Sequence, residues 1–353
     1  MKKILKIILG LIGVLVLFVG LLLALLTLND YKPGAVEGLK IQRDQNQEAG
    51  GDGPFTVYTW NIGFGGMGDQ EDFFMDGGDQ VIVDSKEVVE GYMAGILSTL
   101  DDMDGDFMLI QEIDIESKRS YKMNQLKIIS DQLESYSYSF AKNYDVFYVP
   151  GPIPPLGKVK SGLATFSKFK VSEAKRHSFN SNFSWPTKTF MLDRCFIVSR
   201  INLTDRQGDL YMINAHFSAY DGGDLKAEQL DFVKDFIQDL YKEGHYVVLG
   251  GDWNQTFASV DVDQYPLYDQ GRIFTPYIIP GDWLDAGWSY GVADNAPTYR
   301  LLSGAYEPGV TQTGVIDGFV VSPNVMIDSV RVLDLEFQNS DHNPVELIFR
   351  LKE

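Results

Sequence analysis

The sequence is poor in cysteine, and Cys195 is the only one among its 353 residues. A single cysteine excludes an intrachain disulfide, so the fold must be stabilised by its hydrophobic core. Cys195 lies in the apolar run CFIV, which predicts a buried core residue rather than a nucleophile. This prediction argues against a cysteine hydrolase.

Basic residues are also scarce, with 30 Lys and Arg against 49 Asp and Glu and a net charge of −19. Three of the basic residues, Lys2, Lys3 and Lys6, precede the first apolar segment, so 27 remain for the rest of the chain. A surface of this charge repels polyanions and anionic membranes. We therefore expect no stable nucleic-acid complex, although an enzyme that contacts phosphate through a metal ion is not excluded.

Residues 7–28 form an apolar run without a charge. At about 1.5 Å per residue, such a helix would cross a hydrocarbon core of about 30 Å. Lysines precede the run and Asp30 follows it, so the positive-inside rule assigns residues 1–6 to a cytoplasmic tail and the rest to the outside. The alternative is a cleaved signal peptide, but the run is long for one and LLALLTLND offers no good cleavage site. We expect a single-pass anchor in the cell membrane, with an extracytoplasmic domain.

Residues 29–54 are polar and rich in glycine, which predicts a flexible linker without packed structure. From Phe55 onwards, strand-like apolar runs are interspersed with three stretches of helical spacing, at residues 79–103, 117–134 and 224–242. Strands dominate, so residues 55–353 are expected to form one α/β domain, a two-sheet sandwich flanked by helices. The strand-poor stretch 253–297 predicts functional loops beside the sheet ends.

Polar residues directly follow several of the expected strands. They are Asn61, Glu112, Asn214, His216, Asp252, Asn254, Asp341 and His342, and Asp317 lies inside the apolar run GVIDGFVV. A buried carboxylate needs a compensating partner, so a His, an Arg or a metal is expected to meet Asp317. Oxygen ligands suit Mg²⁺, Mn²⁺ or Ca²⁺, and histidines suit proton transfer. The pattern predicts one site at the rim of the sandwich, whereas His177 and His245 are polar-flanked and expected at the surface.

Six segments carry a resemblance to a known family. TWNIG, LIQEI, NAHF, GGDWN, GVIDGFVVS and SDHNPV match, in order, the motifs of the endonuclease/exonuclease/phosphatase superfamily, over about residues 55–352. The superfamily includes deoxyribonuclease-like enzymes, apurinic endonucleases, neutral sphingomyelinases and inositol-polyphosphate phosphatases. The resemblance implies a deoxyribonuclease-like four-layer sandwich and a hydrolase of phosphate esters that depends on Mg²⁺, Mn²⁺ or Ca²⁺.

The same resemblance implies a role for each matching residue. Glu112 would be the main metal ligand, with Asn61 beside it, and Asp341 would help to hold the metal or its water. His342 would contact the scissile phosphate. Asp317 would orient His342. Asp252 would orient or deprotonate the attacking water. Asn254 and His216 would stabilise charge on the phosphoryl oxygens. Asn214 would serve only as a support.

The branch of the family is narrowed by what the motifs lack. GGDWNQT has no Arg after its Asn, unlike the inositol-polyphosphate phosphatases, and an acidic anchored chain does not suit chromosomal repair. Secreted nucleases and lipid phosphodiesterases remain, so the expected substrate is a phospholipid or nucleic acid, and the protein is expected to be monomeric. The alternative is a catalytically inactive surface protein that keeps the fold for binding.

The expected loops carry two further features. The glycine cluster in NIGFGGMGD predicts a flexible loop after Asn61, and PGPIPP predicts a stiff loop near the site mouth. Aromatic residues in the variable loops can stack on bases, enter a membrane interface or pack on one another. The tether, rather than these aromatic residues, favours a substrate met near the membrane.

Overall fold

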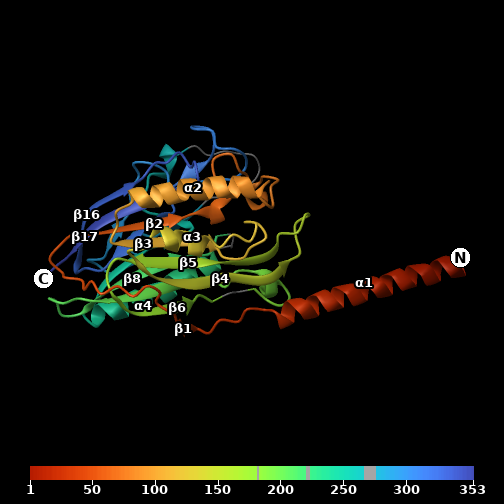
Figure 1. Ribbon diagram of the computed structural model, residues 1–353, viewed down its shortest axis with the longest axis horizontal. Helices are drawn as coiled ribbons and strands as arrows, with labels where there is room; N and C mark the ends of the chain where they lie inside the picture. Colours follow the sequence, from red (N-terminus) through yellow and green to blue (C-terminus); the bar gives the residue numbers. More distant parts are fainter. Residues whose placement is uncertain (181–182, 220–222, 266–275) are drawn as a thin grey trace.

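Two β-sheets pack face to face in the computed structural model, which describes residues 1–180, 183–219, 223–265 and 276–353 (Figure 1). The six-stranded sheet has the order β16-β17-β2-β3-β5-β4. Its strands are β2 (Phe55–Asn61), β3 (Phe107–Asp114), β4 (Ser137–Val149), β5 (Gly157–Ser167), β16 (Val325–Val332) and β17 (Val345–Leu351). Only β2 and β3 are parallel neighbours in this sheet, and the other pairs are antiparallel.

The seven-stranded sheet has the order β1-β6-β7-β8-β9-β15-β12. Its strands are β1 (Val36–Gly38), β6 (Val171–Ser178), β7 (Cys195–Asn202), β8 (Asp209–His216), β9 (Tyr246–Asp252), β12 (Ser289–Gly291) and β15 (Asp317–Val321). Two small sheets pair β10 (Gln255–Phe257) with β11 (Tyr277–Ile279) and β13 (Tyr299–Arg300) with β14 (Thr313–Gly314).

Helices cover the outer face of each sheet. Apolar residues of α2 (Lys86–Asp102) and α3 (Gln125–Gln132) form one core with the six-stranded sheet. The amphipathic α4 (Asp224–Lys242) packs in the same way on the seven-stranded sheet, and a third core fills the space between the sheets. The expected sandwich flanked by helices is therefore confirmed, with α4 at its expected bounds and α2 and α3 shorter than the sequence suggested.

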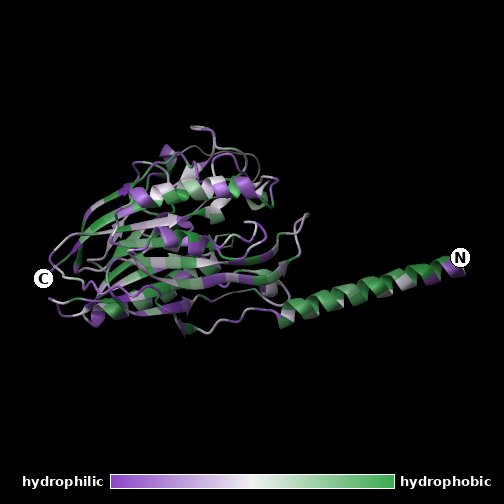
Figure 2. Cartoon of the chain, in the orientation of Figure 1, coloured by the Kyte–Doolittle hydropathy of each residue, from purple (hydrophilic) through white to green (hydrophobic). Residues whose placement is uncertain are grey.

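The N-terminal helix α1 (Lys2–Leu28) extends away from the domain and is apolar along its length (Figures 1 and 2). It is the one helix, among the described residues, that is long and apolar enough to cross a membrane. Only Leu26 is buried, close to the point where the helix reaches the domain. Trp185 meets this end, because its Nε1 donates a hydrogen bond to Thr27 Oγ1 at 3.0 Å.

Strand directions bring the polar strand ends to one end of the sandwich. β2, β3, β8 and β9 all finish there, β15 and β17 begin there, and α1 leaves from the same end (Figure 1). Asp317 pairs in register with Asp252, and His216 with Asp252 on its other side. Residues far apart in the sequence thus become neighbours.

Two sequence-based expectations need correction. Residues 29–54 are not without packed structure, because β1 pairs with β6 and Ala49 is fully buried. His177 is buried rather than on the surface, since its ring packs between Phe196 and Phe236. The stretch 253–297 is strand-poor as expected, since each strand in its described part is three residues long, and its residues 266–275 lie outside the described chain. Cys195 is buried, as expected.

Gly251 is required immediately before Asp252. Its φ is +152°, and a Cβ there would lie 1.9 Å from the carbonyl oxygen of Ala215 on β8. We expect Gly251→Ala to lower the free energy of unfolding by about 3 kcal/mol, because the strands would have to separate. In the control, Gly91→Ala in α2 has open space and should stabilise by up to ~1 kcal/mol. Urea unfolding of the full chain measures both, and equal stability of Gly251→Ala and wild type would contradict the assignment.

His177 should make stability depend on pH. Burial, followed by Lys175 and Arg176, lowers its pKa to about 4 from the ordinary value of 6.5. Between these values the unfolded chain binds a proton that the folded chain does not, so this contribution is complete above pH 6.5 and is lost as the pH falls towards 4. After allowance for solvent screening, wild type should lose about 1–2 kcal/mol more than His177→Phe on acidification. Parallel stability curves for the two proteins would show that His177 does not titrate in this way.

Candidate active site

One cavity of about 580 Å³ collects all the sequence-predicted site residues except Asp317 and Asn214. Asn61, Glu112, His216, Asp252, Asn254, Asp341 and His342 line it. They come from the ends of β2, β3, β8 and β9, the loop after β9 and the segment before β17. With β9 and the loop after it taken as one, five separate segments of the chain therefore contribute to one polar site, as the strand-end pattern predicted.

Glu112 reaches the cavity through an irregularity in β3. The register with β5 shifts between Ile110 and Ile113, and Glu112 has a φ of +56°. A non-glycine residue in the left-handed region stores strain that tertiary contacts must offset. Asn61 Nδ2 lies 3.3 Å from Glu112 Oε1, and the Glu112 side chain is 24% exposed, so its carboxylate borders the cavity.

Asp252 is held from three sides. Asn61 donates a hydrogen bond to its Oδ2 at 3.0 Å, and His216 Nε2 lies 3.2 Å from the same oxygen. Its Oδ1 accepts a hydrogen bond from the backbone N–H of Asn254 at 2.9 Å. Asn254 has a φ of +50°, so the chain turns sharply after β9 and the Asn254 side chain also reaches the cavity. The sequence GGDWN forms this turn.

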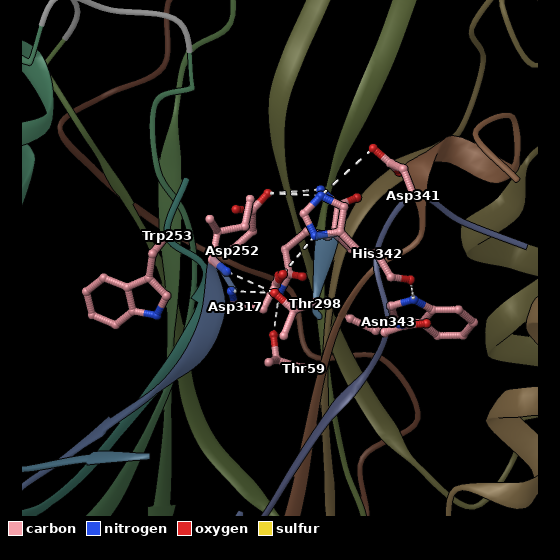
Figure 3. A network of polar contacts seen from close by, with 12 residues as sticks. Thr59, Asp252, Trp253, Thr298, Asp317, Asp341, His342 and Asn343 are labelled. Carbon is pink, nitrogen blue, oxygen red and sulfur yellow. Dashed lines mark hydrogen bonds and ion pairs between the residues drawn. The ribbon is translucent and has the colours of Figure 1, made fainter. Parts of the chain in front are cut away.

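His342 lies between three carboxylates, as Figure 3 shows. Its Nδ1 lies 2.8 Å from Asp317 Oδ2, and its Nε2 lies 3.9 Å from both Asp252 Oδ2 and Asp341 Oδ2. Asp317 is buried behind the ring, and its backbone N–H donates to Thr298 Oγ1. The expectation that a partner would meet the buried Asp317 is confirmed.

Asn214 does not line the cavity. It accepts a hydrogen bond from Gln111 Nε2 at 2.8 Å and donates one to the carbonyl of Ala164 at 2.9 Å. These contacts join β8 of one sheet to β3 and β5 of the other. Asn214 is therefore a structural link between the sheets behind the site, in line with the supporting role expected for it.

The proton affinities follow from burial and from these neighbours. Burial opposes charge on His342, but Asp317 and Asp341 outweigh it and hold the His342 pKa well above its usual range. Burial would raise the pKa of Asp252, yet His216 and His342 hold it well below its ordinary value. Burial raises the pKa of Asp341 to about 7, His342 lowers it, and the charge of Glu112 raises it further. His342 is thus a stable cation beside an ionised Asp252.

Two groups of residues could hold a metal ion. Glu112 and Asp341 offer hard oxygen atoms at the cavity surface, where the two carboxylates repel each other. Asn61 lies beside them with its Nδ2 towards Glu112, because its Oδ1 accepts a hydrogen bond from the Gly63 N–H. A divalent cation would relieve this repulsion, so the donor set fits Mg²⁺ or a similar ion. Asp252, Asp317 and His342 also offer ligand atoms within 4.8 Å of one another. In that group, however, His342 Nδ1 already contacts Asp317, and the Asp317 side chain is only 1% exposed.

Sequence reasoning missed three arginines that line the cavity, Arg119, Arg194 and Arg300. Arg119 forms a two-pronged ion pair with Asp114 and packs on the ring of Phe64. Arg194 contributes to lowering the pKa of His216, after burial itself. Arg194 directly precedes β7, so a search for polar residues at strand beginnings as well as strand ends would have found it.

The loop predictions had mixed outcomes. Pro150, Gly151 and Pro152 line the cavity, so PGPIPP is at the site mouth as expected. The glycine cluster after Asn61 is not a free loop, because Gly63–Gly65 form a buried 3₁₀ turn (η1). The aromatic residues of the expected loops differ in exposure, since Phe64 and Trp283 are buried whereas Phe147 and Trp185 are exposed.

The segment 287–291 has the form GxSxG but not the geometry of a nucleophile elbow. Ser289 is an exposed residue that begins the edge strand β12, and it is not among the residues that line the cavity. The serine of a GxSxG nucleophile elbow lies on a strand-to-helix turn, with a histidine within reach. The described site therefore gives no support to a serine hydrolase.

The profile of the Endonuclease/Exonuclease/phosphatase family matches residues 58–342. No curated protein sequence matches the chain. Among solved structures, an endonuclease/exonuclease/phosphatase from Beutenbergia cavernae has 16% identity and a TM-score of 0.54, covering 85% of this chain and 72% of its own. One from Bacteroides vulgatus has 15% identity and the same TM-score, covering 85% and 100%. D. rerio TDP2, complexed with single-strand DNA product, has 14% identity and a TM-score of 0.53, again covering 85% and 100%.

At these identities the structural matches show the fold alone, and they agree with the two mixed sheets and flanking helices described above. The family match covers most of the chain and spans all eight catalytic and metal residues expected from the sequence, from Asn61 to His342, which is its last residue. This chain therefore belongs to the endonuclease/exonuclease/phosphatase family, whose members are metal-dependent phosphoesterases.

Proposed function

We propose that this protein is a divalent-metal-dependent phosphodiesterase that acts at the outer face of a membrane on a lipid head group or on nucleic acid. One observation carries the proposal: Glu112, Asp341, Asp252, His216 and His342 converge on one cavity. A phosphate ester is anionic and repels an incoming hydroxide, so its hydrolysis needs positive charge and oriented donors around the phosphoryl group.

The chain's own residues would divide the work. Glu112, with Asn61 and Asp341, would hold Mg²⁺, Mn²⁺ or Ca²⁺, which when bound neutralises charge on the phosphoryl oxygens. Asp252 is ionised and fixed by hydrogen bonds, which suits it to orient or deprotonate the attacking water. His342 would place a protonated Nε2 against the phosphate while Asp317 holds its ring.

His216 and Asn254 would complete the site by stabilising charge on the phosphoryl oxygens. Both line the cavity, and both contact Asp252. No covalent enzyme intermediate is required, since the attacking group is water.

The location is part of the proposal. α1 would be an uncleaved single-pass anchor, with the lysines at positions 2, 3 and 6 in the cytoplasm and the catalytic domain outside. The domain would act as a monomer. The competing function is that of an inactive surface-binding protein with the same fold, and the filled catalytic positions argue against it.

Glu112→Gln tests the metal assignment. The full chain in nanodiscs should hydrolyse bis(4-nitrophenyl) phosphate with Mg²⁺ or Mn²⁺ and lose this activity with a chelator. Glu112→Gln should lower kcat/KM by about 10³-fold or more, because the main ligand charge is removed. Glu116→Gln is the matched control, since Glu116 is exposed and pairs with Lys158 and Lys160 at the surface. The activity of this variant should stay within about twofold of wild type. Near-wild-type turnover by Glu112→Gln would contradict the assignment of Glu112 as the main metal ligand.

A second assay separates the two substrate classes. It compares the rate at which the same protein cleaves plasmid DNA with the rate at which it releases head groups from phospholipid vesicles, and His342→Ala is the blank. Cleavage of DNA alone would define a tethered surface nuclease, and release of head groups alone a lipid phosphodiesterase. If the protein hydrolyses none of these phosphate esters in the presence of metal, including the nitrophenyl diester, the inactive surface-binding alternative is favoured.

A further inference from the structure

The cavity is larger and more apolar than a phosphate group needs. Away from the carboxylates and histidines, its wall contains Arg119, Arg194 and Arg300 but is otherwise mostly apolar. The apolar side chains include Phe74, Tyr144, Val149, Leu156, Phe190 and Leu192. Most of these belong to one small hydrophobic cluster that also contains Val146 and Val159. At about 580 Å³ the cavity has the size of sites that bury organic ligands rather than single ions. A hydrophilic ester would leave this wall unused.

The apolar part of the cavity is next to the anchor. β4 and the 3₁₀ turn η3 (Thr187–Phe190) supply Val149 and Phe190 to the cavity wall, and both elements also contact α1. Tyr31, just beyond α1, stacks under Lys142 of β4, with the ammonium nitrogen 4.0 Å from the ring centre. The end of the anchor and the mouth of the cavity therefore lie on the same face of the domain.

Exposed apolar residues surround this face. Ile153 is 95% exposed at the tip of the β4–β5 hairpin, which projects from the end of the domain that α1 leaves (Figure 1). Trp185 is 55% exposed and touches the last turn of α1, and Phe147 on β4 is 48% exposed. Tryptophan favours the interface between hydrocarbon and water. If α1 spans a membrane, these residues lie at the depth of its surface.

We infer that the cavity takes the hydrocarbon chain of a membrane lipid phosphate, with the scissile phosphate at Glu112 and His342. The inference rests on the proposed function and names its substrate class. The hydrocarbon chain of the lipid enters past the β4–β5 hairpin and lies along Val149, Leu156 and Leu192. The polar part of the lipid remains at the end of the cavity that holds Glu112 and His342. The acidic surface repels a nucleic acid along the whole length of the polyanion. It hinders the binding of a lipid less, because the anchor already holds the domain at the bilayer.

Chain length of the substrate is the direct test. The full chain in phosphatidylcholine nanodiscs, with Mg²⁺ or Mn²⁺, is given methyl and hexyl 4-nitrophenyl phosphate, and the ratio of kcat/KM for hexyl over methyl is measured. Each methylene buried in an apolar cavity can raise the ratio by up to about fourfold. We expect wild type to prefer the hexyl ester by at least about 30-fold.

Two variants fill the cavity from different elements, Val149→Trp at the end of β4 and Leu192→Trp before β7, so that one can fail to fold without loss of the test. Each should lower the hexyl-to-methyl ratio at least about tenfold. Met326→Trp is the control, because Met326 is exposed on β16, away from the cavity, and it should keep the wild-type ratio. A ratio near one in wild type, an unchanged ratio in both cavity variants, or faster cleavage of DNA than of the hexyl ester would overturn the inference.

A binding experiment separates this inference from the proposed function. Dodecyl phosphate is titrated into the loaded nanodiscs and into empty ones by calorimetry. Saturable binding that Leu192→Trp weakens at least tenfold would support the cavity assignment even if no ester is hydrolysed. Hydrolysis of the methyl ester without any such binding would leave the phosphodiesterase standing and overturn the lipid-chain inference.

Discussion

The burial of acidic charge at one end of the sandwich is the constraint on which the site depends. Four carboxylates, from Glu112, Asp252, Asp317 and Asp341, surround two histidines, and those of Asp252 and Asp317 are almost completely removed from solvent. Asp317 and Asp252 are balanced by His342 and His216. Glu112 and Asp341 have no comparable histidine or lysine contact of hydrogen-bond length among the described residues, and they border the cavity. The negative charge that no histidine balances is thus on Glu112 and Asp341, which a substrate or a cation can reach.

Much of this arrangement could be predicted from the sequence, because its cause is local. An apolar strand that ends in Asn, Asp, Glu or His brings that residue to the sheet rim, and His216 and Asp252 follow this rule. Asp317 within an apolar run predicted a partner, which is His342. The sandwich followed from the excess of strands over helices.

The rest depends on tertiary contacts that leave no periodic signal. The left-handed φ of Glu112 arises from a register shift against β5, and Asn214 links two sheets whose pairing no local pattern encodes. β1 is three residues long and is specified by its pairing with β6, so its polar surroundings looked like a linker. The flanks of His177 are polar, yet α4 supplies Phe236 from a distant segment to bury it. Composition near a residue is a poor guide when its neighbours come from elsewhere in the chain.

The central claim is that Glu112 and Asp341 hold the metal while Asp317 and Asp252 serve the histidines. Anomalous diffraction from crystals of the full chain grown with Mn²⁺ tests it most directly. The account predicts a manganese peak within bonding distance of Glu112, beside Asn61 and Asp341, with the contact between His342 Nδ1 and Asp317 intact. A peak bound instead by Asp252, Asp317 and His342, with that contact broken, would contradict it.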